Sequence, residues 1–160
     1  MGFIKVGTFL EENKERLGLT LVAGKEGLEN IIISLELNRP GLALAGFVHL
    51  FTYNRVQLIG NTELLYLSTL SKKERDEAFY IICQFDLPCI FFTNGRQPPG
   101  KFIEICDEKK IPLIVTSLST TQFVHLMHYY LEDIFAPSTT VHGTLVDVYG
   151  IGLLFTGRAG

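Results

Sequence analysis

The sequence has 160 residues, of which 47% are hydrophobic and 19% charged, a composition typical of a folded globular protein. The formal net charge of -3 and the pI near 5.8 argue against a nucleic-acid-binding protein, because no strongly basic face is expected. The longest apolar runs are well short of the roughly 20 residues of a membrane span, and the N-terminus lacks the pattern of a secretory signal.

Three cysteines, Cys83, Cys89 and Cys106, lie in apolar surroundings. They show neither C-x-x-C spacing nor a paired histidine pattern, so no metal site is expected from them. We expect buried, reduced thiols and a cytoplasmic protein that binds neither nucleic acid nor membrane.

The first elements alternate between helix and strand. Thr8 and Glu11 have the spacing of a capping box, which predicts a helix that ends at Gly18. Residues 19–24 then predict a strand. Residues 31–35 predict a second strand, which is apolar throughout, as expected of a strand covered on both faces.

The same alternation continues through the middle of the chain. Pro40 and Gly41 begin a brief helical turn that is predicted to end at Gly46. Residues 55–60 predict a strand, and Asn61 is placed to cap the helix that follows.

A second capping box, Ser71 with Glu74, begins the next predicted helix. Residues 88–93 form the most strongly β-prone segment, and Asn94-Gly95 predicts the turn that ends it.

The last three elements of this domain follow the same rules. Residues 98–99 are prolines placed where a helix begins, and residues 112–117 predict another strand. Ser119 and Gln122 form a third capping box, which begins the longest predicted helix and carries it to about Phe135.

This order predicts an α/β layered domain with a mostly parallel sheet flanked by helices over residues 1–135. The pattern changes at Pro137, after which two β-type segments are joined by Tyr149-Gly150. We expect a β-hairpin that opens a second domain over residues 136–160.

An apolar strand pattern leads directly into a glycine-bearing turn formed by Gly157, Arg158, Ala159 and Gly160. A P-loop follows the pattern G-x-x-x-x-G-K-[ST] between a strand and a helix, and these residues supply its first four positions. The lysine and hydroxyl positions fall beyond Gly160. By itself, this pattern also fits an ordinary turn after a strand.

Several stretches resemble, in order, those of bacterial HPr kinase/phosphorylase. They lie at residues 39–46, 55–63, 87–95, 111–123 and 139–157. Together they extend along most of the chain, and several ordered matches are more specific than any one of them.

The resemblance implies a bifunctional, cytoplasmic enzyme of carbon catabolite regulation. Such an enzyme phosphorylates a serine of HPr, the phosphocarrier protein of the sugar phosphotransferase system, with ATP or pyrophosphate and Mg²⁺. It also removes that phosphate by phosphorolysis. The family is a homohexamer whose kinase core lies in its C-terminal domain.

The resemblance implies few site residues within these 160 positions. Gly157, Arg158, Ala159 and Gly160 match the start of the family's nucleotide-binding loop, with Arg158 where the family usually has a non-basic residue. His142 matches a family histidine close to the active site. Because the loop lysine and the acidic catalytic residues would follow Gly160, we expect a truncated kinase domain, no bound cofactor and no kinase activity from this chain alone.

Other candidates have simpler interpretations. His125, His128 and Glu132 have helical spacing for a metal, but two polar positions beside an apolar stripe explain them better. Residues 39–41 can bind an anion at a helix start, although a structural turn is favoured. Asp147 is expected to be a solvent-exposed strand residue. The alternative function is a non-enzymatic α/β module that binds a small ligand or a partner protein.

Overall fold

The computed structural model describes residues 2–137 and 142–157. Its strands are β1 (Ile4–Lys5), β2 (Leu19–Ala23), β3 (Ile31–Ile32), β4 (Leu37–Asn38), β5 (Val56–Ile59), β6 (Ile90–Phe92), β7 (Leu113–Thr116), β8 (Gly143–Val148) and β9 (Ile151–Thr156). Its α-helices are α1 (Val6–Asn13), α2 (Gly41–Leu44), α3 (Asn61–Ser68), α4 (Lys72–Ile82), α5 (Gly100–Lys109) and α6 (Thr120–Phe135), and a 3₁₀ turn, η1, spans Lys25–Gly27.

The central sheet has the strand order β2-β7-β6-β5-β4. Strands β4 to β7 are parallel neighbours, whereas β2 pairs with β7 in the antiparallel sense. This confirms the predicted layered α/β fold with a mostly parallel sheet. The antiparallel strand lies at one edge of the sheet, where α/β folds commonly carry such a strand.

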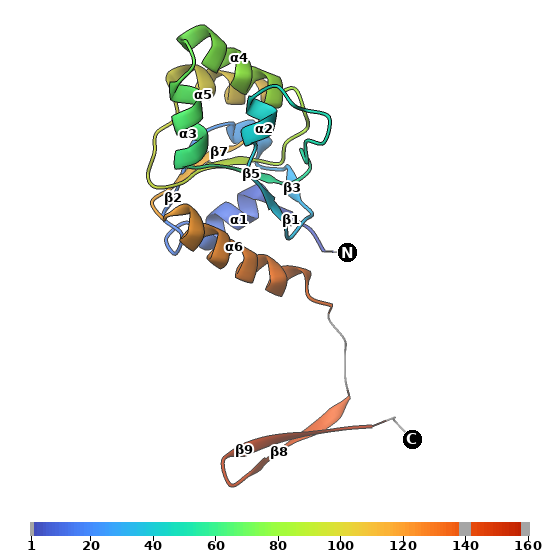
Figure 1. The fold of residues 1–160 in the computed structure, drawn as a ribbon. Coiled ribbons are helices and arrows are strands. Elements are labelled where there is room, and N and C mark those ends of the chain that lie inside the picture. Colours follow the sequence, from blue (N-terminus) through green and yellow to red (C-terminus); the bar gives the residue numbers. More distant parts are fainter. Residues whose placement is uncertain (1, 138–141, 158–160) are drawn as a thin grey trace.

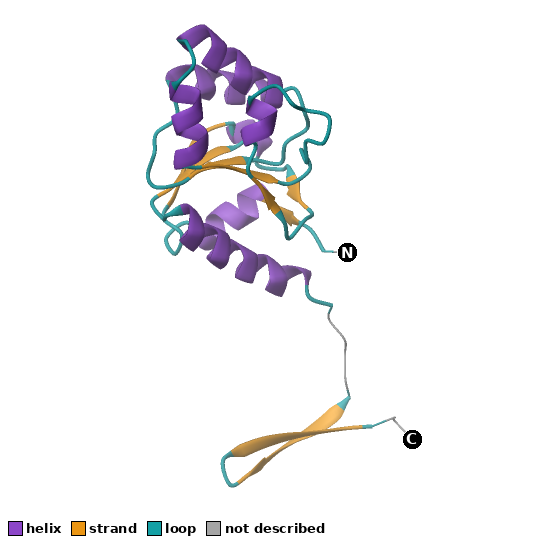
Figure 2. Cartoon of the chain, viewed as in Figure 1, coloured by secondary structure: helices purple, strands orange, loops and turns teal. Residues whose placement is uncertain are grey.

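Helices cover both faces of this sheet (Figures 1 and 2). The helices α2, α3, α4 and α5 lie above it in Figure 1, and α1 and α6 lie below. Alternate strand residues therefore enter different cores. In β6, Ile90 and Phe92 belong to the upper core and Phe91 to the lower one. Burial on both faces explains why the central strands read as continuous apolar runs.

The predicted start of the first helix is wrong. Helix α1 begins at Val6, and no side chain caps it, so Thr8 lies within the helix. Its first backbone amides are bonded from another segment, because Val6 N donates to Asn30 O at 2.8 Å and Gly7 N donates to Leu28 O at 2.8 Å. The first amides of a helix have no acceptor within the helix. When another backbone segment supplies the acceptors, no capping side chain is needed.

Two other expectations are corrected. Gly60, not Asn61, is the N-cap residue of α3. Of residues 31–35, only Ile31 and Ile32 form a strand, and they pair with β1 outside the central sheet. Ile31 is 46% exposed, so this segment is not covered on both faces. An apolar run alone does not distinguish a central strand from a short edge pair.

The other two capping boxes are confirmed. The Ser71 hydroxyl accepts from Glu74 N at 3.2 Å, and the Ser119 hydroxyl accepts from Gln122 N at 3.3 Å. The three cysteines are buried as expected. Among the described residues, no helix is long and apolar enough to cross a bilayer.

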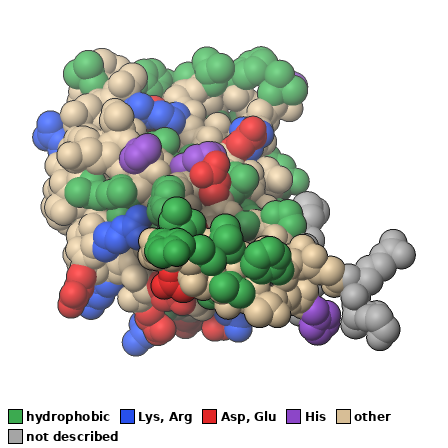
Figure 3. All heavy atoms as spheres, turned by 90° about the horizontal axis from the view of Figure 1, so that it is seen from below, with side chains coloured by type: hydrophobic (Ala, Val, Ile, Leu, Met, Phe, Trp, Pro, Cys, Tyr) green, Lys and Arg blue, Asp and Glu red, His purple; other side chains and the backbone are tan. Residues whose placement is uncertain are grey.

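The predicted hairpin is also confirmed. Strands β8 and β9 pair in the antiparallel sense, and the chain turns at Tyr149 and Gly150, whose φ angles are 53° and 80°. Residues across from each other share a face, so Val146 and Leu153 lie side by side. Every residue of both strands is exposed. The hairpin is the lowest element of Figure 1, and the view from below shows hydrophobic side chains gathered there (Figure 3).

Candidate functional site

Two of the predicted site residues lie at the open end of the hairpin. Gly143 is paired with Thr156 at the end of the ladder. His142 and Gly157 are the next residues on the two strands, so the structure brings them together at this end. Both are exposed, and Asp147 is exposed near the turn. Arg158, Ala159 and Gly160, the other predicted positions, lie outside the described residues.

The sequence-based metal candidates are on α6. His128 Nε2 lies 3.1 Å from Glu132 Oε1, and its Nδ1 lies 3.4 Å from Leu35 O. Within residues 2–137 and 142–157, no group of three or more His, Cys, Asp or Glu side chains is placed to hold a metal ion.

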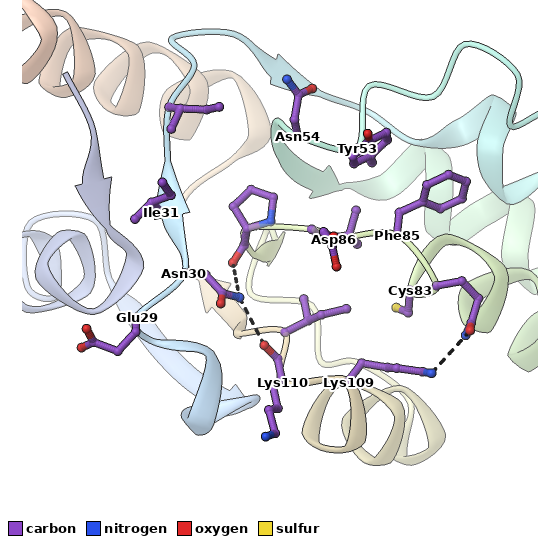
Figure 4. A pocket seen from close by; sticks show the side chains of 15 residues that line it. Glu29, Asn30, Ile31, Tyr53, Asn54, Cys83, Phe85, Asp86, Lys109 and Lys110 are labelled. Carbon is purple, nitrogen blue, oxygen red and sulfur yellow. Dashed lines mark hydrogen bonds between the residues drawn. The ribbon is translucent and has the colours of Figure 1, made fainter. Parts of the chain in front are cut away.

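A groove of about 860 Å³ lies at the amino-terminal end of β6 (Figure 4). One wall is the Glu29–Ile33 segment, and the opposite wall is the connection from α4 to β6. Tyr53 stacks on Phe85 with ring centroids 5.3 Å apart. The Asn30 amide donates to Pro88 O at 3.3 Å and to Lys110 O at 3.2 Å.

The lining of this groove mixes charges of both signs, with Glu29 and Asp86 against Lys109 and Lys110. Its potential nucleophile is the thiol of Cys83. That thiol hydrogen-bonds to Cys106, and this bond together with burial raises the pKa of the Cys106 thiol. Cys83 is itself buried, and a buried thiol in apolar surroundings is typically unreactive. The groove therefore offers binding surface rather than an activated catalytic group.

A polar cluster lies at the other end of the parallel strands. Arg39, directly after β4, donates through Nε to Glu63 Oε1 at 3.1 Å and through Nη2 to Glu63 Oε2 at 2.7 Å. Gly60 N also donates to Glu63 Oε2, at 2.9 Å. The Glu63 side chain is 5% exposed and that of Arg39 is 43% exposed. A buried carboxylate thus fixes an arginine whose outer surface reaches solvent.

Two hydroxyl groups complete this cluster, one from Thr93 directly after β6 and one from Thr120, the first residue of α6. Thr93 Oγ1 lies 2.6 Å from Thr120 Oγ1, and the Asn94 amide donates to Thr93 Oγ1 at 3.2 Å. A Cβ atom on Gly60 would lie 2.7 Å from Thr120 Oγ1 and 2.9 Å from Arg39 Nη2. These polar atoms therefore converge on the bare backbone of Gly60. Of this cluster, the sequence indicated only Arg39.

Comparisons with known proteins show which protein family the chain resembles. The family model described as HPr Serine kinase N terminus matches residues 4–131. HPr kinase/phosphorylase of Leptospira biflexa is 43% identical over 157 residues, covering 98% of this chain and 48% of the relative. The protein of the same name from Chloroherpeton thalassium is 42% identical over 159 residues, covering 98% and 47%.

The chain belongs to the HPr kinase/phosphorylase family. It spans about half the length of the curated relatives that it matches. Among solved structures, it is similar to the CBS and DRTGG domains of the regulatory region of Clostridium perfringens pyrophosphatase. That match has a TM-score of 0.54 and 12% identity, and covers 77% of this chain and 47% of the other. At this identity the likeness concerns the fold alone.

Proposed function

We propose that this chain is the N-terminal half of a bifunctional protein-serine kinase and phosphorylase that acts on HPr in carbon catabolite regulation. Family membership, with 43% identity to a protein named HPr kinase/phosphorylase, is the observation that carries this proposal. We further propose that residues 1–135 form the N-terminal domain and residues 136–160 begin the kinase domain. On the same basis, the whole protein is expected to be a cytoplasmic homohexamer.

The hairpin fits the start of a nucleotide site. A P-loop begins directly after a strand, and Gly157 directly follows β9. Its backbone N–H groups bind phosphate oxygens, so Gly157, Ala159 and Gly160 suit it because no large side chain blocks their approach. ATP or pyrophosphate with Mg²⁺ supplies the phosphoryl group and the metal charge when bound.

His142 has a defined place in this proposal. It stands level with Gly157 at the end of the hairpin and is exposed. An imidazole there is placed to hold or move a proton beside the phosphate-binding loop. Arg158 adds a positive charge to the loop, which favours bound phosphate.

The residues encoded after Gly160 test this proposal directly. We expect a Gly-Lys-Ser or Gly-Lys-Thr segment that begins two residues after Gly160, because this completes the loop that starts at Gly157. A stop codon, or a continuation without that lysine, would overturn the nucleotide site.

A further inference from the structure

The edge of the central sheet at which its parallel strands end is a candidate ligand site. Strands β5, β6 and β7 are parallel neighbours, so their carboxyl ends lie side by side. Helix α5 follows β6 and covers the upper face, whereas α6 follows β7 and covers the lower face (Figure 1). In open α/β sheets, ligands commonly bind outside the carboxyl ends of the parallel strands. The polar cluster around Gly60 occupies this edge.

The cluster has hydrogen-bond donors that a ligand could use. The guanidinium of Arg39 has five N–H groups and donates two of them to Glu63, and the other three have no hydrogen-bond partner among the described residues. Arg96, which is exposed, is positioned by a 3.3 Å bond from its Nε to Asn61 Oδ1. Thr120 is half-buried, and its hydroxyl is held by the fully buried Thr93. Two arginines and a hydroxyl thus lie beyond the carboxyl ends of the parallel strands, in residues that follow β4, β6 and β7.

The charge of the cluster favours an anion. Glu63 neutralises Arg39, and its carboxylate is buried behind that guanidinium. Arg96 then leaves a net positive charge at the edge. Arginine binds phosphate through paired N–H groups, and hydroxyls donate to the remaining oxygens.

Thr120 is the first residue of α6, but the proposed contact uses its side chain rather than the free amides of the helix N-terminus. The N-terminus of α6 is already capped by the Ser119 hydroxyl, which accepts from Gln122 N. The donors come instead from side chains that follow β4, β6 and β7.

We propose that this edge binds the phosphate group of a small phosphate monoester, with Arg39, Arg96 and Thr120 as ligand contacts. Thr93 is a positioning residue, because its buried hydroxyl fixes that of Thr120. This site lies in the α/β domain and is independent of the nucleotide site proposed at the hairpin. It gives the N-terminal domain a ligand-binding function of its own.

Amide chemical shifts of the isotope-labelled 160-residue chain test the proposal. Inorganic phosphate and glycerol 3-phosphate are titrated separately, with chloride at matched ionic strength as the control anion. We expect saturable shifts at Gly60, Asn94 and Thr120 with Kd in the millimolar range. Tighter binding of glycerol 3-phosphate supports a monoester ligand. Equal binding of both overturns the monoester assignment and leaves free phosphate as the ligand.

Matched variants separate binding from folding. Arg96→Gln removes an exposed charge without a buried partner, and we expect about tenfold weaker binding. Arg39→Gln should weaken binding at least as much, and Thr120→Val should remove one donor at similar volume. Lys101→Gln changes an exposed lysine paired with Glu104 and should leave binding unchanged.

Several results would overturn the proposal. They are the absence of saturable shifts at the three amides, equal shifts with chloride, and unchanged binding in Arg96→Gln together with Thr120→Val. Phosphate-induced shifts confined to Gly157 would place binding at the hairpin and also overturn it. None of these results bears on the HPr-directed activity, so the two proposals fail separately.

Discussion

Arg39 and Glu63, which lie 24 residues apart, form a two-bonded ion pair in which the carboxylate is buried and the guanidinium reaches solvent. The pair joins the end of β4 to the first turn of α3. Glu63 also accepts from Gly60 N, so this carboxylate has three donors. Its neighbours thus compensate for its removal from water.

Breaking this pair should therefore destabilise the domain. Arg39→Gln leaves the Glu63 carboxylate with one backbone donor, and we expect a loss of about 1–3 kcal/mol in the free energy of unfolding. Lys101→Gln, in an exposed pair, should cost less than about 0.5 kcal/mol. Urea denaturation of both variants, and of Glu63→Gln alone and combined with Arg39→Gln, measures the coupling. Equal stability of Arg39→Gln and Lys101→Gln would contradict the structural role.

The helix caps provide a second comparison. Ser119→Ala removes an acceptor from the first turn of α6 and should cost about 1 kcal/mol. Thr8→Ala changes a residue inside α1 that caps nothing, so its effect should be within about 0.5 kcal/mol. The denaturant midpoints of the two variants, compared with that of the unaltered chain, measure these losses. A larger effect at Thr8 than at Ser119 would restore the sequence-based capping box and refute the observed start of α1.

Two glycines with similar backbone angles separate steric contact from backbone strain. Gly24 has φ of 73°, and a Cβ there would lie 1.9 Å from Ile111 O. Gly95 has φ of 64° and nothing within 4 Å of such a Cβ. Gly95→Ala should cost about 1 kcal/mol, from the left-handed backbone alone. Gly24→Ala should cost several times more, because the backbone must also move. Equal losses in thermal denaturation would show that the approach to Ile111 is not tight.

The stability of the folded chain at high pH should depend on the ionisation of Tyr130. Burial, followed by its hydrogen bond to Glu12, raises the pKa of Tyr130 to about 12 from an ordinary value of 10.0. The folded state therefore holds this proton more tightly than the unfolded state. Its contribution to stability is complete below about pH 10 and is lost as the pH rises toward 12.

The matched variant is Tyr130→Phe, which keeps the ring and removes the titrating hydroxyl. Stability of this variant should decline less steeply between about pH 10 and 12 than that of the unaltered chain. Tyrosinate absorbance should also lose its highest-pH component. Identical pH profiles for the two proteins would show that the phenol is not protected by Glu12.

Much of the fold could be predicted from local signals. Residues 55–60, 88–93 and 112–117 are apolar runs bounded by turn residues, and each contains a central strand. The caps at Ser71 and Ser119 act within one turn of helix, so sequence spacing identifies them. The amides of Val6 and Gly7 are instead bonded to a segment more than 20 residues away, which no local spacing encodes.

The polar cluster is harder to predict for the same reason. Thr93 and Thr120 lie 27 residues apart, and their hydroxyls meet only because β6 and β7 are neighbours. From the sequence, Glu63 is an ordinary acidic residue in the first turn of a helix. Only the structure shows that it pairs with Arg39. The hairpin end differs, because His142 and Gly157 follow from a two-strand pattern with a turn at Tyr149-Gly150.

We propose above that this chain is the first half of a kinase and phosphorylase acting on HPr. The most direct measurement is transfer of radiolabelled phosphate from ATP with Mg²⁺ to purified HPr. It compares the 160-residue chain with the gene product extended to the length of its relatives. We expect transfer to an HPr serine by the extended protein, its reversal by inorganic phosphate with release of pyrophosphate, and no transfer by the 160-residue chain. Failure of a folded extended protein to phosphorylate HPr would contradict the account.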